Sequence, residues 1–70
     1  MLIRFNKSLA DAVQPRSLKE FWERVLYRPI PVLFYRAQLY EEYGLGSNEE
    51  YVGSVVQNDA LLNAILENTK

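Results

Sequence analysis

The chain contains no histidine and no cysteine among its 70 residues. Without these side chains it has no Ser-His-Asp or Cys-His nucleophile, no zinc site of the usual ligands, no disulfide framework and no haem-attachment motif. Glycine and proline are scarce at three residues each, and we find no repeat, low-complexity tract or flexible linker. We therefore expect a protein that is not an enzyme and holds neither cofactor nor metal.

Long hydrophobic runs are also absent. No stretch approaches the roughly 18 apolar residues that a membrane helix requires, and Arg4 and Lys7 interrupt the segment where a signal peptide needs its apolar part. Hydrophobic residues make up 49% of the chain and charged residues 24%, which is typical of a globular rather than a disordered chain. We expect a single cytoplasmic domain over 1–70, because this length provides only one core.

The strongest helical pattern lies at 17–28. Ser17 and Glu20 have the spacing of a capping box, in which each side chain satisfies a backbone N–H of the first turn. Pro29 disfavours helical geometry at the residue before it. One stripe of this helix is apolar and is expected in the core: Leu18, Phe21, Trp22, Val25 and Leu26.

A second helix is predicted at 31–43. Pro31 suits its first position, where the missing N–H costs nothing, and Gly44 suits a left-handed cap with Leu45 folded back in a Schellman ending. The apolar run 30–35 is bounded by prolines and is also compatible with a buried strand. We favour the helix because proline at the start and glycine at the end form the expected asymmetry.

A third helix is predicted at 48–58, since Ser47 and Glu50 form a second capping-box pattern. Its apolar face would be Tyr51, Val52, Val55 and Val56. Leu61 and Ile65 lie nearly opposite Val52 and Val56 if the helix continues at 100° per residue. Two alternatives follow: Asp59 caps a new helix carrying Leu61, Leu62, Ile65 and Leu66, or one helix over 48–68 presents two apolar faces.

Residues 1–14 are predicted to contain a short helix. Ser8 and Asp11 are placed to cap it, whereas Leu2–Phe5 is compatible with an edge strand or a frayed arm. The expected fold class is all-α: a small helical bundle of three main helices, about 17–28, 31–43 and 48–58, plus short terminal helices. The expected core is Leu18, Phe21, Trp22, Val25, Leu26, Leu33, Leu39, Tyr40, Val52, Val55, Val56, Leu62 and Leu66.

Charge is divided unevenly along the chain. Residues 1–36 carry seven basic and three acidic groups, a net charge of +4, whereas residues 37–70 carry one basic and six acidic groups, a net charge of −5. In one interpretation the halves fold onto each other and partly neutralise. In the other, a bipolar molecule steers an acidic partner or stacks head to tail with copies of itself.

With catalytic groups missing, the expected function is a small non-catalytic protein-interaction module. It would act as an accessory subunit, assembly factor or inhibitor that docks on a larger protein complex, and self-association is a version of the same hypothesis. Tryptophan, tyrosine and arginine dominate binding hot spots. The candidate partner-binding residues are Trp22, Tyr27, Arg28, Tyr35 and Arg36 near the proline-containing turn, and Leu61 and Ile65 on a second apolar face.

The alternative function is a small nucleic-acid-binding regulator. Residues 31–58 have the outline of a helix-turn-helix unit, but the first turn of its recognition helix would be Asn48-Glu49-Glu50, which places two carboxylates against a polyanion. Nucleic acid would instead use the basic N-terminal half. Arginines there would contact phosphates while Tyr27 or Tyr35 stacks on a base: Arg16, Arg24, Arg28 and Arg36.

Overall fold

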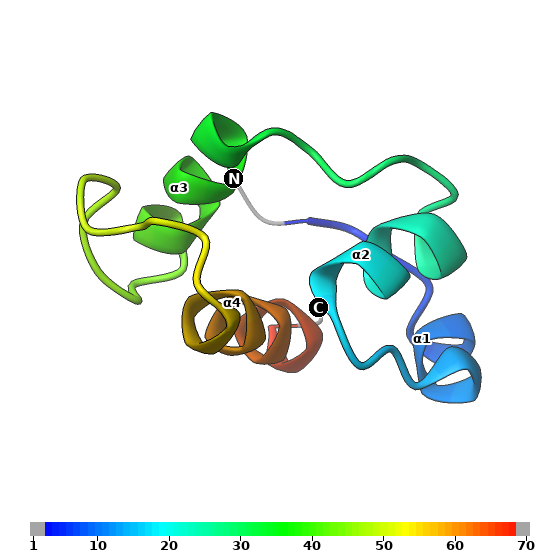
Figure 1. Cartoon of the computed structure of the whole chain (residues 1–70). Helices are drawn as coiled ribbons and strands as arrows, with labels where there is room; N and C mark the ends of the chain where they lie inside the picture. The colour runs from blue at the N-terminus through cyan, green and yellow to red at the C-terminus, as the bar shows by residue number, and fades with distance from the viewer. Residues whose placement is uncertain (1–2, 69–70) are drawn as a thin grey trace.

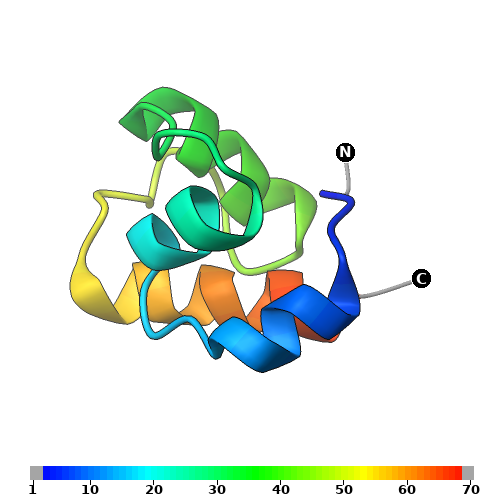
Figure 2. The same ribbon diagram turned by 90° about the vertical axis from the view of Figure 1, so that its right-hand side faces the viewer.

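The computed structural model describes residues 3–68, which are helical and contain no strand (Figure 1). The elements are α1 (Lys7–Val13), α2 (Leu18–Glu20), η1 (Phe21–Val25), α3 (Leu33–Glu42) and α4 (Val55–Glu67). The π-helical segment η1 continues directly from α2. Helices α3 and α4 begin at the same end of the molecule and run in the same general direction (Figure 2). The predicted all-α class is therefore confirmed.

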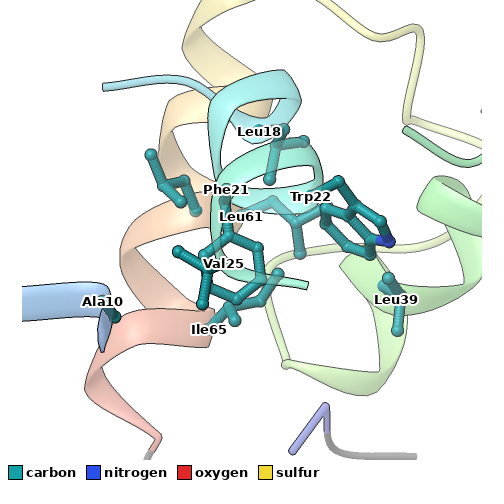
Figure 3. Packing of buried hydrophobic residues seen from close by; sticks show 9 residues of the cluster. Ala10, Leu18, Phe21, Trp22, Val25, Leu39, Leu61 and Ile65 are labelled. Carbon is teal, nitrogen blue, oxygen red and sulfur yellow. The ribbon is translucent and has the colours of Figure 1, made fainter. Parts of the chain in front are cut away.

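The core lies mainly between α4 and the continuous helix formed by α2 and η1, with Leu18 of α2 among its buried residues. Phe21 and Val25 of η1 face Leu61 and Ile65 of α4, and Trp22 is directed toward α3 (Figure 3). The Phe21 ring makes edge-to-face contacts with Phe5 at 5.2 Å and with Trp22 at 5.5 Å between ring centroids. Burying each large side chain contributes about 1.5–3 kcal/mol, so the packing of α2 and η1 against α4 organises the fold.

The helix formed by α2 and η1 begins as predicted. The Glu20 N–H donates to Ser17 Oγ at 3.2 Å, which caps the first turn, while the Glu20 carboxylate accepts from the Arg16 N–H. The predicted end at residue 28 is wrong, because the helix ends at Val25. Tyr27 adopts a left-handed φ of 58°, and the Arg28 N–H donates to the Trp22 carbonyl, which closes the helix before Pro29.

Helix α3 ends as predicted and begins two residues late. Gly44 has a φ of 74°; its N–H donates to the Glu41 carbonyl and the Leu45 N–H donates to the Tyr40 carbonyl. This pair of bonds is the expected Schellman motif. The helix begins at Leu33 rather than Pro31, and the alternative of a buried strand over 30–35 is wrong because the second half of that run forms the first helical turn.

The third helix predicted at 48–58 is wrong. Residues 48–50 form a turn, 51–54 belong to no helix or strand, and α4 begins only at Val55. Ser54 and Gln57 form the capping box of α4, with Ser54 Oγ accepting from the Gln57 N–H at 3.2 Å. Gly53 stands immediately before this box with a φ of 74°, a left-handed conformation that no helix continues through.

Both alternatives for the C-terminal part are wrong as well. Helix α4 is a single helix over Val55–Glu67, so Asp59 lies inside it and caps nothing, and no helix spans 48–68. Because α4 begins at Val55, its buried stripe consists of Leu61, Leu62 and Ile65. The segment before it is free to turn Tyr51 inward, where the Tyr51 ring packs 5.2 Å from the Tyr40 ring.

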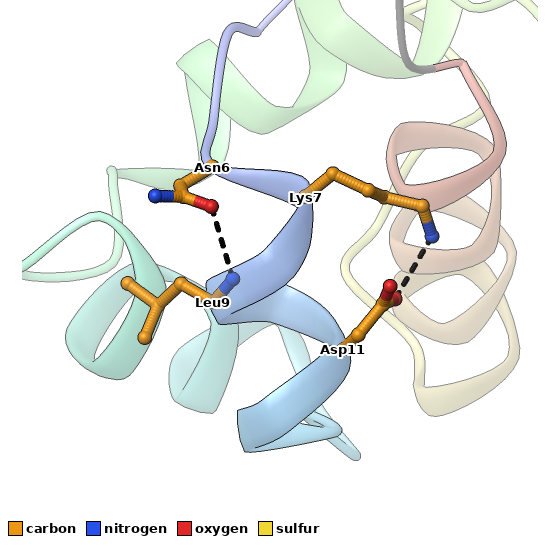
Figure 4. A network of polar contacts seen from close by, with 4 residues as sticks. All are labelled: Asn6, Lys7, Leu9 and Asp11. Carbon is orange, nitrogen blue, oxygen red and sulfur yellow. Dashed lines mark hydrogen bonds and ion pairs between the residues drawn. The ribbon is translucent and has the colours of Figure 1, made fainter.

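The short N-terminal helix is confirmed as α1, but its cap is Asn6 and not Ser8. Asn6 Oδ1 accepts from the Leu9 N–H at 3.0 Å, and Lys7 pairs with Asp11 one turn on at 2.9 Å (Figure 4). Residues 3–5 form neither an edge strand nor a frayed arm, since Ile3 and Phe5 pack against the core. Leu2 lies outside the described residues.

The predicted core is correct for most of the first helix and for parts of the others. Six predicted residues are buried: Leu18, Phe21, Trp22, Val25, Leu39 and Leu62. Three are partly buried: Leu26, Tyr40 and Leu66. Four are exposed, and their assignment to the core is wrong: Leu33, Val52, Val55 and Val56. The residues buried in addition are Ala10, Ala37, Tyr51, Leu61 and Ile65.

Candidate functional site

Most of the exposed large apolar residues lie where α3 and α4 begin. We call six of them the α3–α4 patch: Val32, Leu33, Phe34, Val52, Val55 and Val56. Leu33 is 47% exposed, and the other five are between 71% and 78% exposed. Scattered exposed apolar residues are ordinary, whereas several large ones gathered where two helices begin make this region the candidate functional site.

Gly53 brings the two segments of the patch together. A Cβ built on Gly53 would lie 2.8 Å from Leu33 Cδ1, which is closer than side chains tolerate. Its left-handed φ of 74° also favours glycine, which lacks the Cβ that this conformation crowds. The loop at Gly53 therefore lies directly against Leu33 in the first turn of α3, which places the beginnings of α3 and α4 close together.

A polar network joins α3 and α4 beside the patch. Arg36 donates from Nε to the Pro31 carbonyl at 3.1 Å and from Nη1 to the Tyr51 hydroxyl oxygen at 3.2 Å and to Asn58 Oδ1 at 3.5 Å. The Tyr51 hydroxyl donates to Asn58 Oδ1, and Asn58 Nδ2 donates to the Gly53 carbonyl at 3.3 Å. The guanidinium of Arg36 also lies 5.9 Å from the Tyr51 ring centroid. These contacts hold the beginnings of the two helices in one arrangement.

Burial raises the pKa of the Tyr51 hydroxyl above its usual value of 10.0, and the positive charge of Arg36 opposes this shift only in part. The hydroxyl is therefore protonated at neutral pH. In that state it accepts a hydrogen bond from Arg36 and donates one to Asn58. The network is consequently complete at neutral pH without an acidic side chain.

The residues predicted to bind a partner do not form one surface. Leu61 and Ile65 are fully buried and Trp22 is 5% exposed, so their assignment to a partner surface is wrong. The reason is the late start of α4, whose buried stripe faces η1. Tyr35 packs partly against the core, and Arg36 takes part in the polar network beside the patch.

Tyr27 and Arg28 are exposed, together with Arg24 at the end of η1. We call these three residues the Tyr27 corner. Tyr27 is 74% exposed, and its left-handed φ of 58° costs a side chain roughly 1 kcal/mol relative to glycine. In Figure 1 the chain that follows η1 lies at the right-hand edge, far from segment 51–54 at the left. The Tyr27 corner and the α3–α4 patch are therefore separate surfaces.

Part of the patch could have been found from the sequence. Residues 29–35 and 51–58 are runs without a single charged side chain, in a chain of which 24% is charged. Ser54 and Gln57 have the spacing that marks a helix start, and Gly53 precedes them. Together these signals point to a helix beginning at 55, and at 100° per residue they place Val56 on the face opposite Leu61 and Ile65.

Between residues 3 and 68 no three histidine, cysteine or acidic side chains are grouped so that they could hold a metal ion. None of the helices in that range has the length and apolar character needed to cross a membrane. Comparison of the chain with protein-family models, with curated proteins and with solved structures finds no match.

Proposed function

We propose that this chain is a small, non-catalytic protein-interaction module that binds protein through the α3–α4 patch. In the cell it would act as an accessory subunit, assembly factor or inhibitor within a larger protein assembly. The observation that supports this proposal is the exposure of six large apolar residues on a chain of only 70 residues. Their exposure is unfavourable in water, and covering them supplies the driving force for binding.

The extent of the patch supports a protein as its occupant. From their exposed fractions, the six residues present on the order of 650 Å² to solvent. The largest apolar patch of a typical monomer is about 300–600 Å², and each partner in a standard protein interface contributes about 800 Å². The patch is therefore large for a free surface and close to the size of a binding surface.

Its chemistry supports the same occupant. No side chain in 29–35 or 51–58 is charged, and the nearest cation, Arg36, already donates to three neutral acceptors. Nucleic acid binds mainly through cations placed on its phosphates. An uncharged apolar surface fits the apolar face of a protein much better.

The proposal can be tested by placing a photoreactive amino acid at Val56 in the patch and, as a matched control, at exposed Asn63 two turns further along α4. Irradiation in a lysate of the source cells should join position 56, but not position 63, to a protein. Adding Phe34→Ser should weaken that adduct, because it removes part of the patch. Absence of a protein adduct at position 56, or equal adducts at both positions, would overturn the proposal.

Nucleic-acid binding is a second candidate, supported by the Tyr27 corner. An exposed aromatic ring beside two exposed arginines is the combination that stacks a base and neutralises phosphates. If this candidate is correct, a labelled single-stranded RNA should bind with an affinity that falls steeply with salt, and Tyr27→Ala with Arg28→Ala should abolish binding. The Phe34→Ser variant should bind RNA normally, because the patch lies elsewhere.

A further inference from the structure

We infer that the occupant of the α3–α4 patch is a second copy of this chain, in a two-fold symmetric dimer. This inference rests on the proposed function, since it names the protein that the patch binds. Two properties of the patch support it: the area that it offers and the absence of charge across it.

The area matches what a small dimer needs. If each copy contributes on the order of 650 Å², the interface buries about 1,300 Å² in total, within the range of about 1,200–2,000 Å² found for specific complexes. Crystal-packing contacts mostly stay below about 800 Å². An interface that buried the whole patch on both copies would therefore lie at the lower end of the range for specific complexes.

The lack of charge suits a partner with the same surface. In a two-fold interface the residues near the axis face their own counterparts, so a charge there would meet a like charge. The runs 29–35 and 51–58 bring no charge to such an axis. Within these two runs, a different protein that relied on charge for its specificity would find no charged side chain. Arg36 beside them is already engaged by three hydrogen bonds.

The α3–α4 patch is also preorganised for association. The Arg36, Tyr51 and Asn58 side chains link α3 to α4, and Gly53 lies against the first turn of α3. Little conformational freedom is therefore left to lose on binding, which lowers the cost of association.

Sedimentation equilibrium of the full chain from about 1 µM to about 1 mM tests the inference, because a modest dimer has a dissociation constant in this range. The mass should rise toward twice 8.2 kDa with concentration. Val56→Asp should raise the dissociation constant at least about tenfold by placing a carboxylate in the interface. Val56 lies in the first turn of α4, where a negative charge favours the helix, so this variant should still fold.

Asn63→Asp is the matched control, because it adds the same charge to an exposed position of the same helix and should leave the dissociation constant unchanged. A dimer that Val56→Asp leaves intact, or that Asn63→Asp weakens equally, would overturn the inference. A monomer at every concentration whose position 56 cross-links to a different protein would overturn the second copy as occupant and leave the proposed function standing. A monomer without any cross-link at position 56 would overturn both.

Discussion

Replacing Gly53 with alanine tests how the α3–α4 patch is assembled. Gly53 and Gly44 share a φ of 74°, so alanine at either position carries the same left-handed backbone penalty of about 1 kcal/mol. They differ in their surroundings. A Cβ on Gly44 meets nothing within 4 Å, whereas a Cβ on Gly53 meets Leu33 Cδ1 at 2.8 Å.

Leu33 is half exposed, so it can rotate away from the new methyl group at a cost of about 1 kcal/mol for leaving its preferred rotamer. We therefore expect Gly44→Ala to lower the free energy of unfolding by about 1 kcal/mol and Gly53→Ala by about 2 kcal/mol. Against a total of roughly 4–10 kcal/mol for a chain of this length, both losses are measurable.

The assay is urea unfolding followed by far-ultraviolet circular dichroism at one low protein concentration, so that association contributes equally to every variant. The decisive comparison repeats both glycine substitutions in a Leu33→Ala background. Removing Cδ1 should abolish the extra cost of Gly53→Ala and leave the cost of Gly44→Ala unchanged. Equal costs in the natural background, or an extra cost at Gly53 that survives Leu33→Ala, would refute the described approach of segment 51–54 to α3.

Three further predictions address the polar network, the start of α4 and the core. The pKa of the Tyr51 hydroxyl is raised above 10.0 in the folded chain, so the contribution of this group to stability is complete below pH 10 and is lost as the pH rises through the folded-state pKa. Urea unfolding from pH 8 to 11 should therefore show a steeper loss of unfolding free energy for the natural chain than for Tyr51→Phe. Ser54→Ala should lower the unfolding free energy by about 1 kcal/mol because it removes the cap of α4, whereas Ser47→Ala should lower it hardly at all. A larger loss for Ser47→Ala than for Ser54→Ala would instead place the start of the helix after Ser47. At a concentration where the chain is monomeric, Leu61→Ala should lower the unfolding free energy by about 2–5 kcal/mol and Val56→Ala by less than about 0.5 kcal/mol. Similar decreases in melting temperature for the two variants would contradict the burial of Leu61 and the exposure of Val56.

Local signals in the sequence predicted the features that depend on neighbours along the chain. The Ser17 cap, the left-handed Gly44 and the buried stripe of the first helix are all present as expected. Each depends on bonds or periodicity within a few residues, and such interactions act before any tertiary contact forms. The helical class of the protein follows from the same signals.

The start of α4 could not be predicted in this way, because two capping-box patterns compete for it. Ser47 with Glu50 and Ser54 with Gln57 both have the required spacing, and each cap contributes only about 1 kcal/mol. Burial of the Tyr51 ring and the left-handed turn at Gly53 favour the second start.

The position of the candidate surface follows from that choice of helix start. With α4 beginning at Val55, Leu61 and Ile65 face η1 and are buried, whereas Val55 and Val56 are left in solvent. The sequence alone determined that this chain is helical, that it lacks the residues of most catalytic sites, and where two helix ends lie, at Ser17 and at Gly44. Only the tertiary structure decided that Leu61 and Ile65, rather than Val55 and Val56, belong to the core. Burial against the helix formed by α2 and η1 contributes more free energy than any local signal that distinguishes the two pairs.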